Sequence, residues 1–232
     1  MASNPEQENM IWDPLLLTLK LAVVTTLLLL VIAIPLASWL AQTQSKLKPV
    51  LETLVSMPLV LPPTVLGFYF LIAFSPGNAF GNWLNEWFGI KLVFSFSGLV
   101  VASILYSLPF MVHPIQSGLS SLSPSLSEAS YLMGKSKRDT LIKVLLPNIK
   151  PAMLTGIVLA FAHTIGEFGV VLMIGGNIPE VTKVASIAIY DEVETLNYRM
   201  ANLYSGILFA VTFAILLSVY LINGSTTKSF WK

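Results

Sequence analysis

The sequence has little charge. Only 11% of its 232 residues are Asp, Glu, Lys or Arg, whereas 55% are hydrophobic. Soluble domains carry about 25% charged residues, because a surface in contact with water requires them. A deficit of this size indicates that lipid surrounds part of the chain. The formal net charge of +1 also argues against a nucleic-acid partner, which would require a strongly basic face.

Cysteine is absent, which excludes disulfide bonds and thiolate metal sites. We therefore expect no metal ion and no other cofactor. The first 13 residues contain Glu6, Glu8 and Asp13 but no Lys or Arg. They lack the basic region of a secretory signal peptide, so we expect the first apolar stretch to remain as a membrane span.

Five apolar stretches reach the length of about 20 residues that a helix needs to cross a bilayer. They cover residues 15–40, 51–74, 96–119, 151–174 and 201–222. The sequence therefore predicts an all-α, polytopic membrane protein with about five transmembrane helices. We expect one transmembrane domain over residues 15–222, with tails at residues 1–14 and 223–232.

Lysine and arginine are distributed unevenly between the loops, and cytoplasmic loops carry the excess. One set of loops and tails contains Lys46, Lys48, Lys135, Lys137, Arg138, Lys143, Lys150, Lys228 and Lys232. The opposite set contains only Lys91, Lys183 and Arg199. We expect a bacterial inner-membrane protein with its amino terminus outside and its carboxyl terminus in the cytoplasm.

The longest inner loop, residues 120–150, has the pattern of a short helix followed by a turn. Ser123 and Pro124 form a good helix start, and Ser125 and Glu128 have the spacing of a capping box. Gly134 is suited to the left-handed conformation that ends a helix. The predicted apolar face consists of Leu126, Ala129 and Met133. By periodicity alone this could be an amphipathic helix on the membrane surface.

The spacing of this loop resembles a known motif. Glu128, Ala129 and Ser130 are followed after three residues by Gly134, and after nine more by residues 144–147, VLLP. This is similar to the EAA loop of permeases of binding-protein-dependent ABC importers, with Ser130 and Val144 as departures. The resemblance implies that a short helix docks into a soluble ATPase, present in two copies. The residues it implicates are Ser127, Glu128, Ala129, Ser130, Leu132, Met133, Gly134, Leu146 and Pro147. Alternatively, Glu128 is only a charge within the loop helix.

The same loop contains a misleading similarity to a nucleotide site. Residues 129–136, ASYLMGKS, approach the phosphate-binding pattern G-x-x-x-x-G-K-[ST]. The first glycine is missing and no strand precedes the segment. We therefore expect a transport permease that is not itself an enzyme, with ATP hydrolysed by another polypeptide.

The second predicted span is interrupted by proline. It contains Pro58, Pro62, Pro63 and then Gly67, and proline breaks or kinks a helix. Broken helices within membranes often line a pathway, because freed backbone groups need water or protein partners. A pathway element and a simple packing kink are equally compatible with this pattern.

The fourth predicted span contains a carboxylate. Glu167 lies between Gly166 and Gly169 in an apolar run, and His163 is placed one helical turn earlier as a plausible partner. An intramembrane carboxylate should face protein or water. These residues could form a gate or hinge, or they could anchor two helices together without a role in transport.

These two spans also resemble one branch of the permease family. The segments MPLVLPPTVLGFYF and FAHTIGEFGVVLMIGGNIP are similar to those of molybdate permeases, with sulfate/thiosulfate permeases close behind. Met57 and His163 depart from the pattern. The resemblance implies transport of molybdate, with tungstate as an alternative cargo, by a pair of these chains. It also implies that a periplasmic oxyanion-binding protein contacts Asn177, Ile178 and Pro179.

Two other classes of membrane protein remain as alternatives. An intramembrane enzyme would need a motif such as H-E-x-x-H or G-x-S-x-G, and neither occurs in the sequence. A channel would have no need for a docking loop with this spacing. A sulfate importer is the alternative within the same class.

Overall fold

The computed structural model describes residues 5–227, and within that range it contains helices and no strands. In chain order the helices are α1 (Pro5–Gln42), α2 (Lys48–Val60), α3 (Pro63–Phe74), α4 (Ala79–Phe88), α5 (Phe96–Ser120), α6 (Pro124–Leu132), α7 (Lys137–Thr140), the π-helix η1 (Leu141–Leu145), α8 (Leu146–Asn148), α9 (Lys150–Gly166), α10 (Gly169–Gly175), α11 (Ala185–Glu194) and α12 (Tyr198–Thr227). The predicted all-α class is confirmed.

Three segments are long and apolar enough to cross a membrane as single helices. They are Trp12–Gln42 in α1, Phe96–Ser120 in α5 and Tyr198–Ser218 in α12. Two further candidates are bent pairs, Lys48–Val60 with Pro63–Phe74 and Lys137–Asn148 with Lys150–Gly166. By length and composition the described residues therefore hold three candidate spans, or up to five if each bent pair counts as one span, and the predicted number of about five stays a prediction. The fourth predicted span is interrupted, because α9 ends at Gly166.

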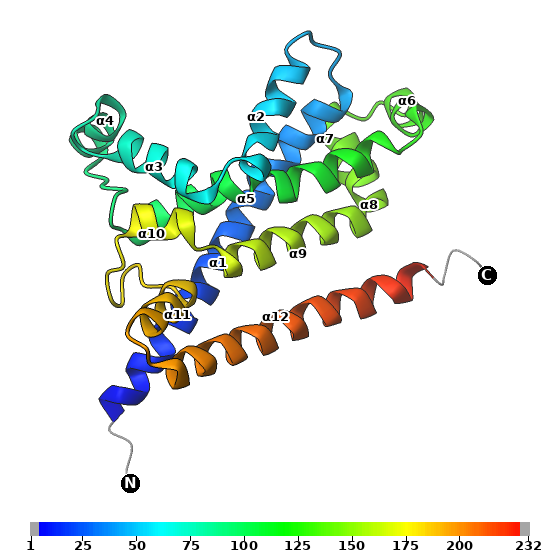
Figure 1. Ribbon diagram of the computed structural model, residues 1–232. Helices are drawn as coiled ribbons and strands as arrows, with labels where there is room; N and C mark the ends of the chain where they lie inside the picture. The colour runs from blue at the N-terminus through cyan, green and yellow to red at the C-terminus, as the bar shows by residue number, and fades with distance from the viewer. Residues whose placement is uncertain (1–4, 228–232) are drawn as a thin grey trace.

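The core forms where α1, α5 and α9 pack along one another (Figure 1). Small residues allow this close approach: Ala33, Ala37 and Ala160 are fully buried. A Cβ atom on Gly156 of α9 would lie 3.1 Å from the backbone oxygen of Met111 in α5. In contrast, α12 contacts mainly α11 and α9 and leaves much of its apolar surface exposed, as expected for a helix facing lipid.

The loops gather at two opposite ends of the bundle. In Figure 1 the α1–α2 connection, the segment α6–α8 and the last turns of α12 lie at one end, whereas α4, α10 and α11 lie at the other. The first end contains Lys46, Lys135 and Arg138, which belong to the set that the charge bias assigns to the cytoplasm. The grouping agrees with the prediction, while the sidedness stays a prediction.

The second predicted span is sharply broken. Helix α2 ends at Val60, α3 begins at Pro63, and the two axes differ by 114°. Pro62 and Pro63 have no N–H groups to donate to the carbonyls of Pro58 and Leu59. Loss of two successive helical hydrogen bonds accounts for the break, so the proline-rich sequence predicts its position correctly.

Candidate functional site

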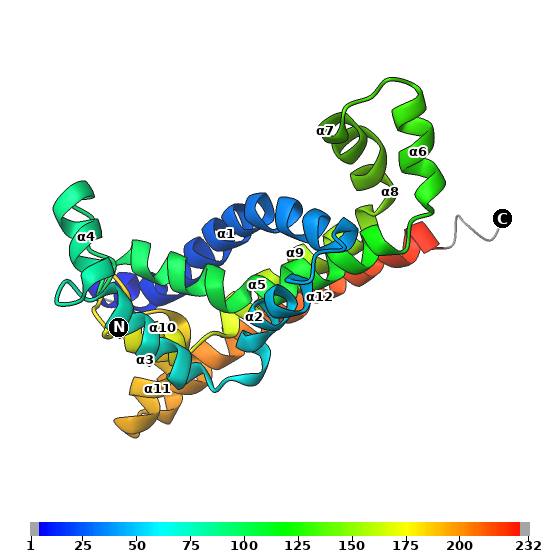
Figure 2. The ribbon, with the colours of Figure 1, turned by 90° about the horizontal axis from the view of Figure 1, so that it is seen from above.

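Residues 120–150 form a helical hairpin that projects beyond the end of the bundle (Figure 2). Helix α6 runs outward, a turn at residues 133–136 reverses the chain, and α7, η1 and α8 run back. Gly134 has φ +74°, the left-handed conformation predicted for it. The turn is closed by Gly134 N–H donating to the Tyr131 carbonyl at 2.9 Å and Lys135 N–H donating to the Ser130 carbonyl at 3.1 Å.

The start of α6 is only partly as predicted. Ser123 is the N-cap and its hydroxyl accepts from the Ser125 N–H at 3.4 Å, while Pro124 takes the first helical position. The predicted capping box between Ser125 and Glu128 is wrong. Because the helix begins two residues earlier, Ser125 lies inside it, and its hydroxyl bonds with that of Ser123 at 2.8 Å.

The base of the hairpin is joined firmly to the membrane bundle. The segments Lys137–Asn148 and Lys150–Gly166 meet at 81° around Ile149. Pro151 has no N–H to donate to the Pro147 carbonyl, which explains the bend at this point. Leu145 and Ile149 are buried in the same apolar cluster as Leu29 and Ile115. A force on the hairpin would therefore be transmitted to α9 and to the core.

A buried polar contact holds the two arms of the hairpin together. The hydroxyls of Ser130 in α6 and Thr140 in α7 lie 2.8 Å apart, and both residues are almost inaccessible. Leu126 is half-buried on the same face. The predicted apolar face is wrong for Ala129 and Met133, which are exposed, because the buried stripe runs through Leu126 and Ser130 instead.

We predict that Ser130→Ala destabilises the hairpin by about 1 kcal/mol, because it removes one buried hydrogen bond. The double variant S130A/T140V should recover much of this loss, because valine at position 140 has no hydroxyl that would be buried without a hydrogen-bond partner. A double-mutant cycle on the thermal unfolding of the purified chain measures the coupling. Strictly additive effects would show that the two hydroxyls do not stabilise each other.

The outer face of the hairpin tip carries exposed apolar side chains. Leu132 is 90% exposed and Met133 70%, and Tyr131 beside them is also exposed. Glu128 is exposed and forms no ion pair with the residues that the structure describes. Apolar side chains rimmed by polar groups at a projecting tip are typical of a protein-docking surface. This arrangement can accept a partner from the aqueous side.

A second candidate site lies where two broken spans meet. Helix α9 ends at Gly166, Glu167 is extended with φ −67° and ψ 130°, and α10 starts at Gly169. Opposite this break lies the start of α3. A Cβ atom on Gly169 would lie only 2.8 Å from the Cβ of Pro63, and one on Gly67 would lie 2.8 Å from the Cβ of Met173. Glycine is thus required at both points of contact.

The contact between the breaks borders a cavity of about 420 Å³. Its walls include Pro63, Tyr106, His163, Gly166 and Glu167. The structure therefore brings together the predicted gate residues from the second and fourth spans. Pro62 is exposed at the adjoining break, and Gly67 is buried against α10.

Glu167 and His163 do not form the predicted pair. Because the helix ends between them, the two side chains no longer share one helical face. His163 Nδ1 lies 2.9 Å from the Ser107 hydroxyl, and its ring stacks against Phe110 at 4.1 Å between centroids. Glu167 is 3% exposed, and its carboxylate oxygens have no hydrogen-bond partner among residues 5–227. The Ser103 hydroxyl lies near this carboxylate and is the polar side chain that interacts with it.

Glu167→Gln should stabilise the protein while reducing transport. A buried carboxylate without hydrogen bonds is costly when ionised, and the neutral amide has nearly the same shape. We expect the thermal midpoint to rise by about 2–4 °C, equivalent to about 1 kcal/mol in a chain of this size. Substrate uptake should fall if the carboxylate acts in the gate. Unchanged uptake and unchanged ATPase coupling would remove Glu167 from the mechanism.

The segment Asn177–Pro179 follows α10 as a tightly fixed loop at the end opposite the hairpin. Asn177 has φ +56°, and its Nδ2 donates to the two carboxylate oxygens of Asp191 at 3.1 and 3.0 Å. Lys183 pairs with the same carboxylate at 2.6 Å. Ile178 and Pro179 are left exposed. A fixed loop with exposed apolar residues could contact a partner on this side.

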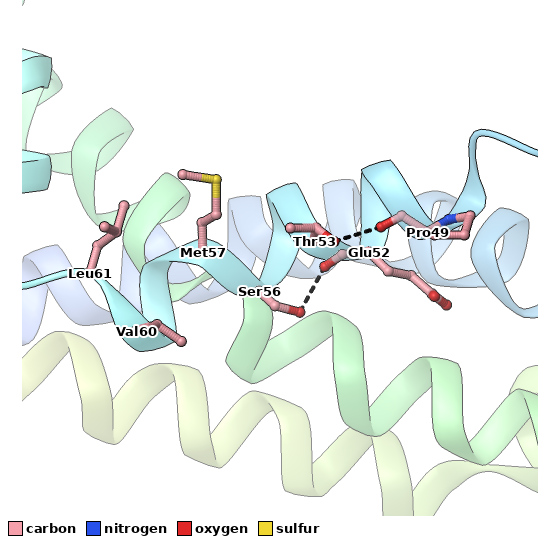
Figure 3. Close-up of a pocket in the computed structure, with 7 residues that line it drawn as sticks. All are labelled: Pro49, Glu52, Thr53, Ser56, Met57, Val60 and Leu61. Carbon is pink, nitrogen blue, oxygen red and sulfur yellow. Dashed lines mark hydrogen bonds between the residues drawn. The ribbon is translucent and has the colours of Figure 1, made fainter.

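A further cavity, which the sequence did not reveal, lies along α2 and has both polar and apolar walls. Its volume is about 570 Å³. Figure 3 shows the residues that line it: Pro49, Glu52, Thr53, Ser56, Met57, Val60 and Leu61. Glu52 accepts from Gln116 Nε2 at 2.6 Å, and Ser56 lies 3.1 Å from His113 Nε2. These contacts connect α2 with α5. The spacing of Glu52 and Ser56, one helical turn apart, was a signal for this polar face.

The described residues contain no cluster of three or more His, Asp or Glu side chains able to hold a metal ion. The expectation that the chain needs no metal stays a prediction, because the structure carries no bound groups.

The chain is similar to known transport proteins. It is 45% identical over 205 residues to the molybdenum transport system permease protein ModB of Azotobacter vinelandii, covering 88% of this chain and 90% of that protein. It is 33% identical to the sulfate transport system permease protein CysT of Escherichia coli (strain K12), covering 74% and 62% respectively.

A similar solved structure is that of a bacterial alginate ABC transporter in complex with an alginate pentasaccharide-bound periplasmic protein. Its matching chain has a TM-score of 0.75 at 21% identity, with 93% of this chain and 79% of that chain covered. At this identity the likeness establishes the fold of the transmembrane domain. The family model described as binding-protein-dependent transport system inner membrane component matches residues 33–227. The chain therefore belongs to the family of inner-membrane permease components of binding-protein-dependent ABC transport systems.

Proposed function

We propose that this chain is the membrane-spanning subunit of an importer for molybdate, and that tungstate follows the same route. The observation that carries this proposal is the 45% identity to a molybdenum permease across nearly the whole length of both proteins. The sulfate permease is less similar and extends well beyond the matched region. A sulfate importer is therefore the weaker alternative.

The hairpin supplies the coupling to ATP in this proposal. Its apolar tip, with Leu132 and Met133, docks into a separate ATPase subunit on the cytoplasmic side. Closure of the ATPase moves the hairpin as a unit, because the Ser130–Thr140 contact holds its arms together. The bend at Ile149 then transmits the movement to α9, which ends at the gate.

The gate is the contact between the two broken spans. The breaks after Val60 and after Gly166 leave α3 and α10 as short segments packed closely together. Such segments are able to shift relative to α2 and α9 without bending a continuous helix. Movement of α9 would open this contact on one side of the membrane at a time, which is alternating access.

The complete importer contains further chains. Two copies of this chain enclose one pathway, because a single copy leaves the cavity-lining face of α2 uncovered. Two ATPase subunits bind at the two hairpins. A periplasmic binding protein delivers the oxyanion to the opposite end, where Ile178 and Pro179 are exposed. In this proposal the amino terminus is outside and the carboxyl terminus is in the cytoplasm, as the charge bias predicts.

ATPase stimulation by loaded binding proteins tests the cargo. The complex is reconstituted in lipid nanodiscs, and hydrolysis is measured with binding protein carrying molybdate, tungstate or sulfate. We expect binding protein loaded with molybdate or tungstate to stimulate ATP hydrolysis more than binding protein without ligand. Stimulation by sulfate alone would replace the molybdate assignment with the sulfate alternative.

A further inference from the structure

A cavity of about 510 Å³ lies beside the hairpin, between its arms and the end of α1. It opens between the last turns of α1 and the arms of the hairpin. Its polar and aromatic lining includes Ser38, Trp39, Gln42, Tyr131, Lys137 and Arg138. None of these residues belongs to the gate, and Tyr131 and Lys137 flank the turn at the docking tip.

Two positive charges face this cavity without compensation. Lys137 and Arg138 have no carboxylate within ion-pair distance among the residues that the structure describes. The neighbouring carboxylate, Asp139, is already occupied by Lys143 at 2.6 Å and by the Ser136 hydroxyl at 2.8 Å. The hydrogen bond from Lys143 lowers the pKa of Asp139 below its ordinary value, so this pair persists at neutral pH. An anion would therefore complement the cavity.

The cavity adjoins the end of the first candidate membrane span. The apolar segment of α1 ends at Gln42, one of the residues in the cavity wall. Trp39 and Tyr131 combine an apolar ring with a polar atom, as aromatic residues at membrane interfaces do. Toward the membrane, an exposed apolar stripe continues from the cavity along α1. It consists of Leu28, Val31, Ile32 and Trp39, which are between 43% and 71% exposed.

We propose that this cavity binds an anionic phospholipid. Arg138 and Lys137 contact the headgroup phosphate, and the acyl chains lie along the exposed stripe of α1. The two positive charges together with the exposed apolar stripe of α1 favour a lipid over a soluble partner. An ATPase on the aqueous side could complement the charges, but it could not cover a stripe within the membrane. Basic pockets between membrane helices are known to suit such headgroups. The lipid would brace the end of α1 against the hairpin.

Lipid binding to the purified full chain tests the proposal. Native mass spectrometry measures the affinity for phosphatidylglycerol, with phosphatidylcholine and inorganic phosphate as comparisons. The variant K137Q/R138Q should bind phosphatidylglycerol about 10-fold or more weakly, from about a fivefold contribution per basic residue near a membrane surface. Its affinity for phosphatidylcholine should not change. Arg138→Lys, which retains the charge, should preserve most of the binding.

The control K46Q/K135Q removes the same charge at the same end of the bundle from residues outside the cavity wall. It should bind phosphatidylglycerol like the unaltered chain. Equal losses in both double variants, or equal affinity for the two lipids, would overturn the proposal. Binding of inorganic phosphate as tight as that of the lipid would show a free-anion site instead. Unchanged lipid binding with loss of ATPase co-purification in K137Q/R138Q would assign the cavity to the ATPase.

Discussion

Replacing Leu132 with Glu is expected to weaken association with the proposed ATPase subunit by about 100-fold or more. Leu132 is 90% exposed at the hairpin tip and has no packing role within the chain. In the docked complex this side chain would be desolvated, and burying an unpaired carboxylate there costs several kcal/mol, where each 1.4 kcal/mol is about a tenfold change in affinity. Co-purification of the ATPase with the membrane subunit measures the loss, and transport should fall with it.

The matched control is Leu196→Glu. Leu196 is 70% exposed and lies at the end of the bundle opposite the hairpin. This variant adds the same charge to a similarly exposed leucine, so it should retain the ATPase. Normal co-purification with Leu132→Glu would show that the tip is not the docking surface. The thermal midpoints of both variants should match that of the unaltered chain, since neither leucine is buried.

Gly169→Ala is expected to reduce uptake by at least about tenfold while leaving the ATPase bound. The added methyl group would lie 2.8 Å from the Cβ of Pro63, closer than two carbon atoms can approach. The contact between the broken spans must then separate, and overpacking of this kind costs about 1–3 kcal/mol. Uptake in cells and ATPase co-purification distinguish a damaged gate from a disassembled complex.

Gly206→Ala is the matched control for this prediction. A Cβ atom at Gly206 in α12 would meet nothing within 4 Å. The same chemical change should therefore leave uptake and stability unaltered. Gly67→Ala, which places a methyl group 2.8 Å from the Cβ of Met173, should repeat the effect of Gly169→Ala from the other side of the contact. Normal uptake in both Gly67→Ala and Gly169→Ala would remove the contact from the transport mechanism.

Local chemistry made several features predictable from the sequence. Pro62 and Pro63 cannot donate helical hydrogen bonds, so they predict the break between α2 and α3 at the correct place. Ser123, Pro124 and Gly134 predict the start and end of α6, because each acts through its own backbone geometry. Apolar length predicts the spans formed by α1, α5 and α12, since the bilayer sets the length of a span independently of tertiary contacts.

Features that depend on tertiary contacts could not be predicted in the same way. The pairing of His163 with Glu167 assumed a continuous helix, but the chain leaves the helix at Glu167 and His163 bonds instead with Ser107, 56 residues away in sequence. The Ser130–Thr140 contact could not be predicted, because in the sequence Ser130 is only a mild departure from the family motif. The cavity along α2 depends on Gln116 and His113 from another helix.

Uptake of molybdate into proteoliposomes tests the central claim most directly. The liposomes contain this chain as the only permease together with its ATPase subunit, and ATP is supplied on the side of the hairpin. With molybdate-loaded binding protein on the opposite side, we predict molybdate accumulation that requires ATP and is lost with Leu132→Glu. Accumulation independent of ATP, or undiminished in the Leu132→Glu variant, would contradict the account of an importer driven through the hairpin.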